Sequence, residues 1–203
     1  AANNQLSSEK LDQYIMMGEL SLDGTLLPIK GVLPIAIRAK EDGFKGIIIP
    51  MANAAEAAVV NGLEVIGVNN ITQVVDFLSG KTTIPATHID TEHVFRQQSN
   101  LIDLDFCEVK GQENVKRAME VAAAGGHNII MVGPPGAGKS MLAKRISSIL
   151  PPLSLSEALE TTKIHSVAGN LGKGCSLMYQ RPFRSPHHTI SDVALVGGGS
   201  YPQ

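Results

Sequence analysis

The sequence has no tryptophan, only two cysteines and a net charge of −2. Cys107 and Cys175 are far apart and form no CxxC pair, so we expect buried thiols rather than a disulfide framework. No apolar run approaches the ~20 residues that span a bilayer, and no signal peptide is recognisable. The small net charge provides no general attraction to nucleic acid. We therefore expect a cytoplasmic protein without a membrane segment.

Residues 1–80 contain alternating strand and helix patterns. The predicted strands are 18–24, 45–50 and 63–68, and the predicted helices are 32–43, 53–62 and 70–80. Asn53 with Glu56, and Asn70 with Gln73, have the spacing of helix N-caps. Strands separated by single helices favour parallel pairing. Together with 43% hydrophobic and 18% charged residues, the pattern predicts an α/β protein.

A second unit is predicted after residues 81–104, which lack clear periodicity and are interpreted as a linker. One helix is expected to begin at Gln112 and to end at Gly125–Gly126. Its predicted inner face consists of Val115, Ala118, Met119 and Ala122. Residues 128–132 are predicted as a buried strand, and 139–150 as a helix. The side chains expected to point inward from that helix are Leu142, Ile146, Ile149 and Leu150.

The most specific motif is GPPGAGKS, which runs from Gly133 to Ser140 and fits the pattern G-x-x-x-x-G-K-[ST]. A predicted strand precedes it and a predicted helix follows it, as in phosphate-binding loops. The motif therefore predicts a site for ATP with Mg²⁺. The alternative is a glycine-rich turn with a solvated lysine. Chance would produce the pattern in roughly 1% of chains of this length.

Each part of this loop has a predicted role. Small residues at 136–138 let backbone N–H groups curl around phosphate oxygens, whereas the two prolines before them have no N–H and stiffen the loop. The helix that starts near Lys139 directs its positive dipole end toward the anion. Lys139, the predicted catalytic residue, supplies charge to the β- and γ-phosphates, and Ser140 supplies a hydroxyl ligand to Mg²⁺. The predicted nucleotide-binding residues are Gly133, Pro134, Pro135, Gly136, Ala137, Gly138, Lys139 and Ser140.

Two longer segments carry a family resemblance: GHNIIMVGPPGAGKSMLAKR at 126–145 and RPFRSPHH at 181–188. Through them, residues 105–203 closely resemble the magnesium-chelatase-like AAA+ ATPases, and within that group the YifB/ComM branch. The resemblance implies an ATP-driven homo-hexamer. In this branch the motor is described as a helicase that migrates DNA branches, and it is linked to natural transformation.

Residues 1–80 resemble the second half of a Lon-protease-like (ribosomal protein S5 domain 2-like) domain, through GELSLDGTLLPIKG and GFKGIIIP. Where Lon proteases carry a catalytic lysine, this sequence has Leu33, and Lys30 lies three residues earlier. An apolar side chain cannot act as a base for a serine, so peptidase activity is expected to be lost. The resemblance then implies a scaffold or a collar that contacts nucleic acid.

The predicted fold class is α/β. A partial Lon-like βα unit (1–80) is followed by the linker (81–104) and the first part of a P-loop AAA+ domain (105–203). A complete motor also needs a Walker B strand ending in Asp-Glu, and no segment after Ser140 has that form. The chain is therefore expected to be an internal part of a longer protein, with little ATP hydrolysis of its own.

The resemblance also suggests roles outside the loop. Asp105, Val109, Gly111 and Gln112 match a segment that packs near the adenine in AAA+ proteins, although an ordinary lead-in to a helix is an equal alternative. The segment 181–188 is either a DNA-contacting loop or a structural loop between subunits. Its candidate DNA-contacting residues are Arg181, Arg184, His187 and His188.

Three functions remain open from the sequence. The first is a DNA-processing AAA+ motor, and the second is a chelatase motor that drives Mg²⁺ insertion into a porphyrin. The third is an ATP-responsive assembly scaffold. The Lon-like segment favours the first, because chelatase motor subunits usually lack it.

Overall fold

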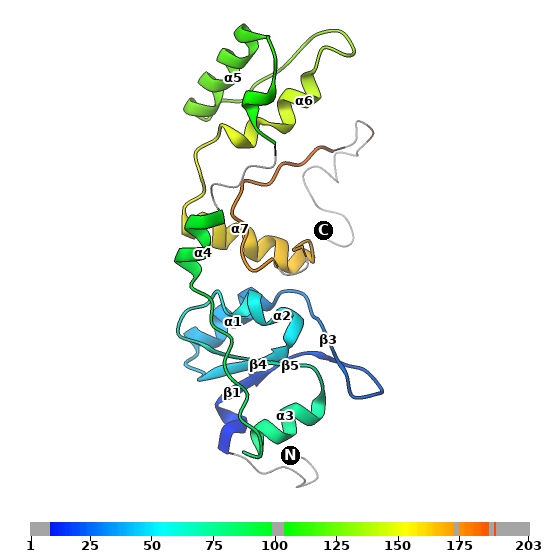
Figure 1. The fold of residues 1–203 in the computed structure, drawn as a ribbon, viewed down its shortest axis with the longest axis vertical. Coiled ribbons are helices and arrows are strands. Elements are labelled where there is room, and N and C mark those ends of the chain that lie inside the picture. The colour runs from blue at the N-terminus through cyan, green and yellow to red at the C-terminus, as the bar shows by residue number, and fades with distance from the viewer. Residues whose placement is uncertain (1–8, 99–103, 173–174, 187–188, 190–203) are drawn as a thin grey trace. The chain divides into compact units, whose positions relative to one another are not determined.

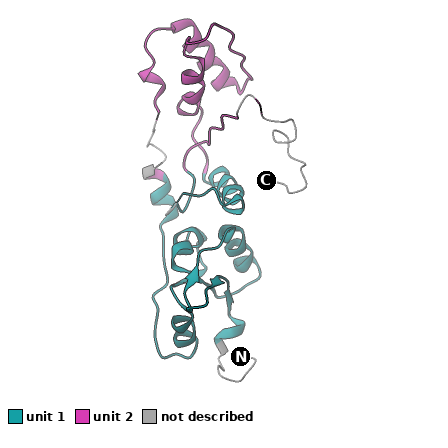
Figure 2. Ribbon diagram, turned by 90° about the vertical axis from the view of Figure 1, so that its right-hand side faces the viewer, with its two compact units in different colours: residues 1–95, 155–178 teal, residues 96–154, 179–203 magenta. Residues whose placement is uncertain are grey.

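The computed structural model shows two compact units that interleave along the sequence (Figures 1 and 2). The structure describes residues 9–98, 104–172, 175–186 and 189. The first unit comprises residues 1–95 and 155–178, and the second comprises residues 96–154 and 179–203.

A three-stranded parallel sheet in the order β1–β4–β5 forms the centre of the first unit. Its strands are β1 (Tyr14–Met16), β4 (Gly46–Pro50) and β5 (Glu64–Val68). Ile47 pairs with Ile15 on one side and with Val65 on the other. The α/β class and the parallel pairing of the predicted strands 45–50 and 63–68 are confirmed. The prediction was wrong for 18–24, because the strand that pairs with β4 on its other side is β1, whereas Glu19–Leu20 pairs with a hairpin partner. A 3₁₀ helix, η1 (Glu9–Asp12), precedes the sheet, and β2 (Glu19–Leu20) with β3 (Leu26–Leu27) forms a separate antiparallel hairpin.

Helices cover both faces of this sheet (Figure 1). They are α1 (Val32–Glu41), α2 (Met51–Ala57) and α3 (Ile71–Leu78). Successive strand residues point to opposite faces. Ile47 and Ile49 therefore pack with α1 and α2, whereas Ile48 packs with α3. Because both faces are buried, β4 is a continuous apolar run rather than an alternating one.

One of the two predicted N-caps is confirmed. Asn70 caps α3, since its Oδ1 accepts a hydrogen bond from the backbone N–H of Gln73 at 2.9 Å. The predicted cap at Asn53 was wrong, because α2 begins two residues earlier, at Met51. The side chain of Asn53 instead bonds both backbone groups of Ile29, accepting at 3.0 Å and donating at 2.9 Å. The Asn53 side chain thus bonds a residue distant in the sequence, Ile29, instead of capping its own helix.

Two further helices lie where the sequence analysis predicted none. Helix α4 (Thr91–Gln98) falls within the segment interpreted as a linker. Helix α7 (Leu155–Ala168) follows the glycine-rich loop in the sequence but packs against α1 in the first unit. The compact units follow spatial contacts, whereas the predicted domains 1–80 and 105–203 follow sequence resemblance. The domain boundaries therefore stay a prediction.

The second unit is built mainly from helices around a small core. Its elements are η2 (Phe106–Glu108), α5 (Glu113–Gly125), α6 (Lys139–Lys144) and η3 (Ile146–Ser148). The core contains Phe106, Val109, Met119 and Leu142. Helix α5 ends as predicted, with Gly126 in the left-handed conformation (φ 61°).

Two predictions for this unit were wrong. Residues 128–132 form no strand, and the side chains of Ile130 and Val132 are 87% and 91% exposed. Strands need partners for their backbone hydrogen bonds, and the described part of the second unit contains no other strand. The helix predicted at 139–150 stops at Lys144, because the Arg145 carbonyl accepts bonds from the backbone N–H and the hydroxyl of Ser148 instead.

Candidate phosphate-binding loop

The backbone of the loop from Gly133 to Ser140 is open. Gly136 and Gly138 have φ values of 79° and 80°, which L-residues with a Cβ rarely adopt. A Cβ on Gly136 would meet no atom of the described residues within 4 Å. In the described part of the chain, five backbone N–H groups of the loop have no hydrogen-bond acceptor: those of Gly133, Gly136, Gly138, Lys139 and Ser140. A run of unpaired N–H groups on an open backbone is what an anion site requires.

Lys139 already lies over the start of the loop. Its Nζ donates to the carbonyl oxygens of Gly133 and Pro134, at 2.8 and 2.7 Å. An ammonium group has three donors, so one remains for another partner. These two contacts hold the ammonium group at the loop. A phosphate oxygen would be a stronger acceptor for it than either carbonyl. Ser140, the first residue after it in α6, is exposed.

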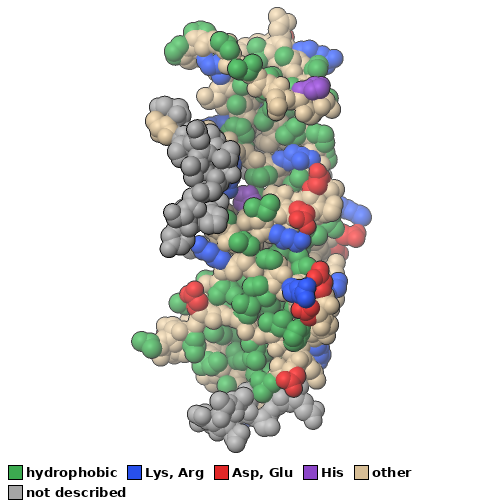
Figure 3. Space-filling view, turned by 180° about the vertical axis from the view of Figure 1, so that it is seen from behind, with side chains coloured by type: hydrophobic (Ala, Val, Ile, Leu, Met, Phe, Trp, Pro, Cys, Tyr) green, Lys and Arg blue, Asp and Glu red, His purple; other side chains and the backbone are tan. Residues whose placement is uncertain are grey.

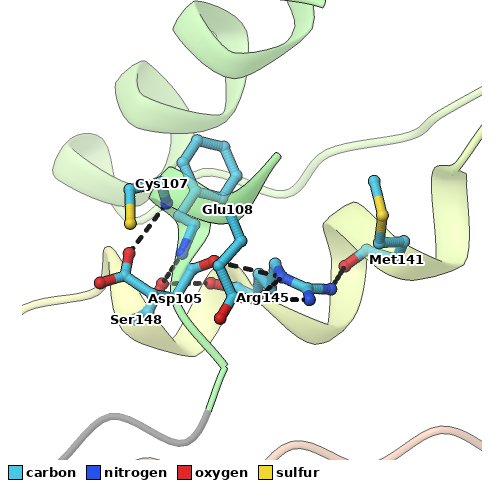
Figure 4. A network of polar contacts seen from close by, with 7 residues as sticks. Asp105, Cys107, Glu108, Met141, Arg145 and Ser148 are labelled. Carbon is cyan, nitrogen blue, oxygen red and sulfur yellow. Dashed lines mark hydrogen bonds and ion pairs between the residues drawn. The ribbon is translucent and has the colours of Figure 1, made fainter. Parts of the chain in front are cut away.

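A polar network ties the helix after the loop to the segment before α5 (Figure 4). Arg145 donates to the Glu108 carboxylate through Nε at 3.1 Å and through Nη2 at 2.7 Å. Its Nε also donates to the Asp105 carbonyl at 3.1 Å, and the backbone N–H of Phe106 donates to the Ser148 hydroxyl at 3.1 Å. The Arg145 side chain is only 15% exposed and that of Glu108 is 50% exposed, so this network is a partly buried support for the loop's helix.

Asp105 takes part in this network through its side chain as well as its carbonyl. Its carboxylate accepts a hydrogen bond from the backbone N–H of Cys107 at 2.8 Å, and this bond lowers the pKa of Asp105 below its ordinary value. A side-chain interaction of the thiol with the same carboxylate, and to a smaller extent desolvation, raises the pKa of Cys107. Cys107 is exposed and Cys175 is half-buried, so the prediction of buried thiols was wrong for Cys107 and too strong for Cys175. Asp105 acts here as the cap of η2.

The segment expected near an adenine contacts the loop directly. Gln112, at the start of α5, donates from Nε2 to the carbonyl of Ala137 at 3.1 Å. Gly111 and Gln112 both have positive φ, 68° and 56°. Val109 is buried in the core beside Leu142 of α6. Sequence reasoning placed these residues near the site but missed the bond to Ala137, because it joins positions 25 residues apart.

The structure brings one of the candidate DNA-contacting residues into a structural contact. Arg181 donates from Nε to the carbonyl of Pro151 at 2.8 Å, within the second unit. Arg184 is exposed. His187 and His188 lie outside the described residues. The DNA contact predicted for this segment stays a prediction.

In the first unit, Leu33 is fully buried, and its backbone N–H donates to Oε1 of Glu56 at 3.0 Å. Lys30 is exposed and its side chain lies over Gly169, where a Cβ would come within 2.5 Å of the lysine Cε. The position expected to hold a catalytic lysine in Lon proteases therefore holds a core side chain.

The first unit also contains a groove of about 550 Å³ between α1, α7 and the loop before β5. Apolar Ile37, Val60 and Leu159 line it together with Lys40 and Glu41. Because the charges along its rim are of both signs, the groove selects neither anions nor cations. The open loop of the second unit is the stronger candidate site.

Among the described helices, none combines the length and the apolar composition needed to cross a bilayer.

Comparison with known proteins places this loop within a family. The family described as "Magnesium chelatase, subunit ChlI" matches residues 105–203, and "Subunit ChlI of Mg-chelatase" matches residues 1–53. YifB of Escherichia coli is 42% identical over 202 residues, covering 100% of this chain and 38% of YifB. Competence protein ComM of Haemophilus influenzae is 40% identical over 204 residues, covering 100% of this chain and 40% of ComM.

Two other relatives complete the comparison. An uncharacterised protein of Mycobacterium tuberculosis is 45% identical over 192 residues, covering 95% of this chain and 37% of that protein. Lon protease 2 of Bacillus subtilis is 42% identical over 62 residues, covering 30% of this chain and 11% of that protease. The chain thus spans well under half the length of its relatives. With whole-chain similarity to YifB and ComM and two magnesium-chelatase matches, the chain belongs to the YifB/ComM family of magnesium-chelatase-like proteins.

Proposed function

We propose that this chain carries the nucleotide-binding segment of an AAA+ ATPase, and that Gly133–Ser140 binds ATP with Mg²⁺. The observation that carries the proposal is the open loop itself. Five of its backbone N–H groups have no acceptor within the described residues, and a lysine ammonium lies beside them. Membership of a magnesium-chelatase-like family supports the same role.

The residues of the loop fit a nucleotide phosphate chain. Two carbonyl bonds hold Lys139 at the loop, and an anionic oxygen is a stronger acceptor than a neutral carbonyl. Lys139 is therefore expected to exchange these carbonyls for phosphate oxygens. The exposed hydroxyl of Ser140 would hold Mg²⁺, which usually takes only one or two protein ligands beside phosphates and water. The bound ion would neutralise charge on the phosphates.

For the whole protein, we propose a hexameric motor that processes DNA in recombination or natural transformation. The relative named as a competence protein supports this role. On the face seen in Figure 3, basic and acidic side chains are interleaved among apolar ones. We propose residues 181–188 as the DNA-contacting segment, with Arg184 as the exposed candidate within the described part.

A chelatase motor is the second candidate, and the family description "Magnesium chelatase, subunit ChlI" supports it. An ATP-responsive assembly scaffold is the third. The three differ in what should stimulate ATP hydrolysis. Branched DNA should do so for a DNA motor, a porphyrin with partner subunits for a chelatase, and neither for a scaffold. Steady-state phosphate release by the longer protein, with each addition in turn, separates them.

Nucleotide binding itself is tested by calorimetry with Mg·ADP on the wild type and on Lys139→Ala. We expect the variant to lose binding. Lys144→Ala is the matched control, because Lys144 is an exposed lysine in the same helix, outside the motif. Unchanged binding by Lys139→Ala would contradict the proposal, as would equal losses in both variants.

We also propose that the Lon-like part has no peptidase activity. Its support is the burial of Leu33 at the expected position of the lysine. Casein and short fluorogenic peptides, with ATP, are the substrates to use. Cleavage that survives Lys139→Ala but disappears when a serine of residues 1–80 is replaced would show that this part is a protease.

A further inference from the structure

Gln112, which contacts the loop, has a backbone conformation that a simple packing role does not explain. Gln112 is the one non-glycine residue with a positive φ in the part of the chain that the structure describes. Glycine is the residue that adopts this conformation without steric cost. Glutamine therefore occupies a backbone position that disfavours it. Its side chain is used, since Nε2 donates to the carbonyl of Ala137 at 3.1 Å.

This hydrogen bond fixes the orientation of the peptide unit between Ala137 and Gly138. In a trans peptide the C=O and the N–H point in opposite directions. With its carbonyl directed at Gln112, the unit between Ala137 and Gly138 must direct the N–H of Gly138 away from Gln112. That N–H is one of the five without an acceptor within the described residues.

Without the bond, little would hold this peptide unit in place. Gly138 has a φ of 80° and no Cβ, so sterics at this end permit the unit to rotate. A rotated unit would present a carbonyl oxygen, which repels a phosphate, where the N–H now lies. The Gln112 amide lies next to this unit, since a Cβ on Gly138 would lie 3.4 Å from Nε2, and its bond to the Ala137 carbonyl opposes the rotation.

The amide is itself anchored to a rigid element. The carbonyl of Gln112 accepts the backbone N–H of Lys116 at 3.0 Å in the first turn of α5. Met119 of the same helix packs in the core with Leu142 of α6, the helix that follows the loop. Both ends of the contact are therefore fixed to the same core.

We infer that Gln112 is a positioning residue that latches the 137–138 peptide so that the N–H of Gly138 is available to a phosphate group. The inference rests on the proposed nucleotide-binding function and adds a determinant outside the GPPGAGKS motif. The family resemblance suggests that this segment packs near the adenine base. The inference instead assigns Gln112 a contact with the phosphate-binding loop.

The test uses Gln112→Gly, because glycine keeps the backbone conformation and removes only the side chain. We expect its thermal unfolding midpoint without ligand to equal or exceed that of the wild type. Its affinity for Mg·ADP should fall about 2- to 10-fold, the range for one lost hydrogen bond. Its affinity for pyrophosphate, which has no base, should fall by the same factor. Gln112→Glu keeps the size of the side chain but loses the donor, and it should weaken both ligands at least as much.

The outcomes are separable. If Gln112→Gly and Gln112→Glu both bind the two ligands with wild-type affinity, the positioning role of Gln112 is refuted. A loss for Mg·ADP with unchanged pyrophosphate binding would overturn it in favour of a base contact. Should Gln112→Gly unfold earlier than the wild type, the glutamate variant decides by the same comparison. Wild-type binding by Lys139→Ala would instead overturn the proposed function.

Discussion

Replacing Glu56 is expected to destabilise the first unit according to whether the new side chain keeps a hydrogen-bond acceptor. Glu56 is 8% exposed, between α1, α2 and α7. Its Oε1 accepts from the backbone N–H of Leu33 at 3.0 Å and from the hydroxyl of Ser166. Its Oε2 lies 3.5 Å from Nδ2 of Asn53, at the limit of a hydrogen bond. One oxygen therefore makes both strong contacts.

The expected magnitudes follow from those contacts. In Glu56→Ala, the N–H of the fully buried Leu33 loses its acceptor, which costs about 1–3 kcal/mol. The lost Ser166 bond and the removed methylene groups add about 1–2 kcal/mol. The total is about 2–5 kcal/mol, a large part of the ~5–15 kcal/mol that stabilises a typical domain. Glu56→Gln keeps an oxygen at the Oε1 position and loses only the weak contact to Asn53, so it should cost about 1 kcal/mol or less.

Urea unfolding followed by circular dichroism measures both variants, and hydrogen exchange at the Leu33 amide reports the local contact. The alanine variant should speed that exchange, whereas the glutamine variant should leave it close to wild type. Equal destabilisation by alanine and glutamine would refute the reasoning, because it would mean that the negative charge, not the acceptor, holds this site together.

Three further outcomes are expected. Asn70→Ala removes the cap of α3 and should lower the free energy of unfolding by about 1 kcal/mol, as measured by urea unfolding; no change would mean that the bond to Gln73 is not needed. Gly46→Ala would place a Cβ 2.3 Å from the carbonyl oxygen of Glu64, so it should cost about 2–3 kcal/mol in the same assay. Gly172→Ala, where no atom of the described residues would lie nearer than 4.0 Å to the added Cβ, is its control, and equal costs would contradict the steric argument. The pKa of Asp105 is lower in the folded state, so its contribution is present above the ordinary carboxyl pKa near ~3.9 and is lost as the pH falls through the folded-state value. Acid unfolding of Asp105→Asn should therefore depend less on pH than that of the wild type, and an identical dependence would argue against this role.

Much of the first unit could be predicted because its patterns are local. The strands at Gly46–Pro50 and Glu64–Val68 are short apolar runs bounded by turns, and α1 before them and α3 after them begin and end close to the predicted positions. The cap at Asn70 is equally local, since it joins residues three positions apart. Asn53 has the same spacing to Glu56, yet it failed as a cap because Ile29, 24 residues away, offered two backbone bonds.

By itself, the sequence determined where the candidate site lies, because the eight residues of GPPGAGKS define their own loop through glycine conformations and a lysine at a set position. Only the tertiary structure decided what supports that loop. The bonds from Gln112 to Ala137 and from Arg145 to Glu108 join positions 25 and 37 residues apart, and no periodicity in one sequence encodes such distances. The tertiary structure also decided that residues 128–132 form no strand. A strand is stabilised by hydrogen bonds to a neighbouring strand rather than by its own composition, and the described part of the second unit offers no such neighbour.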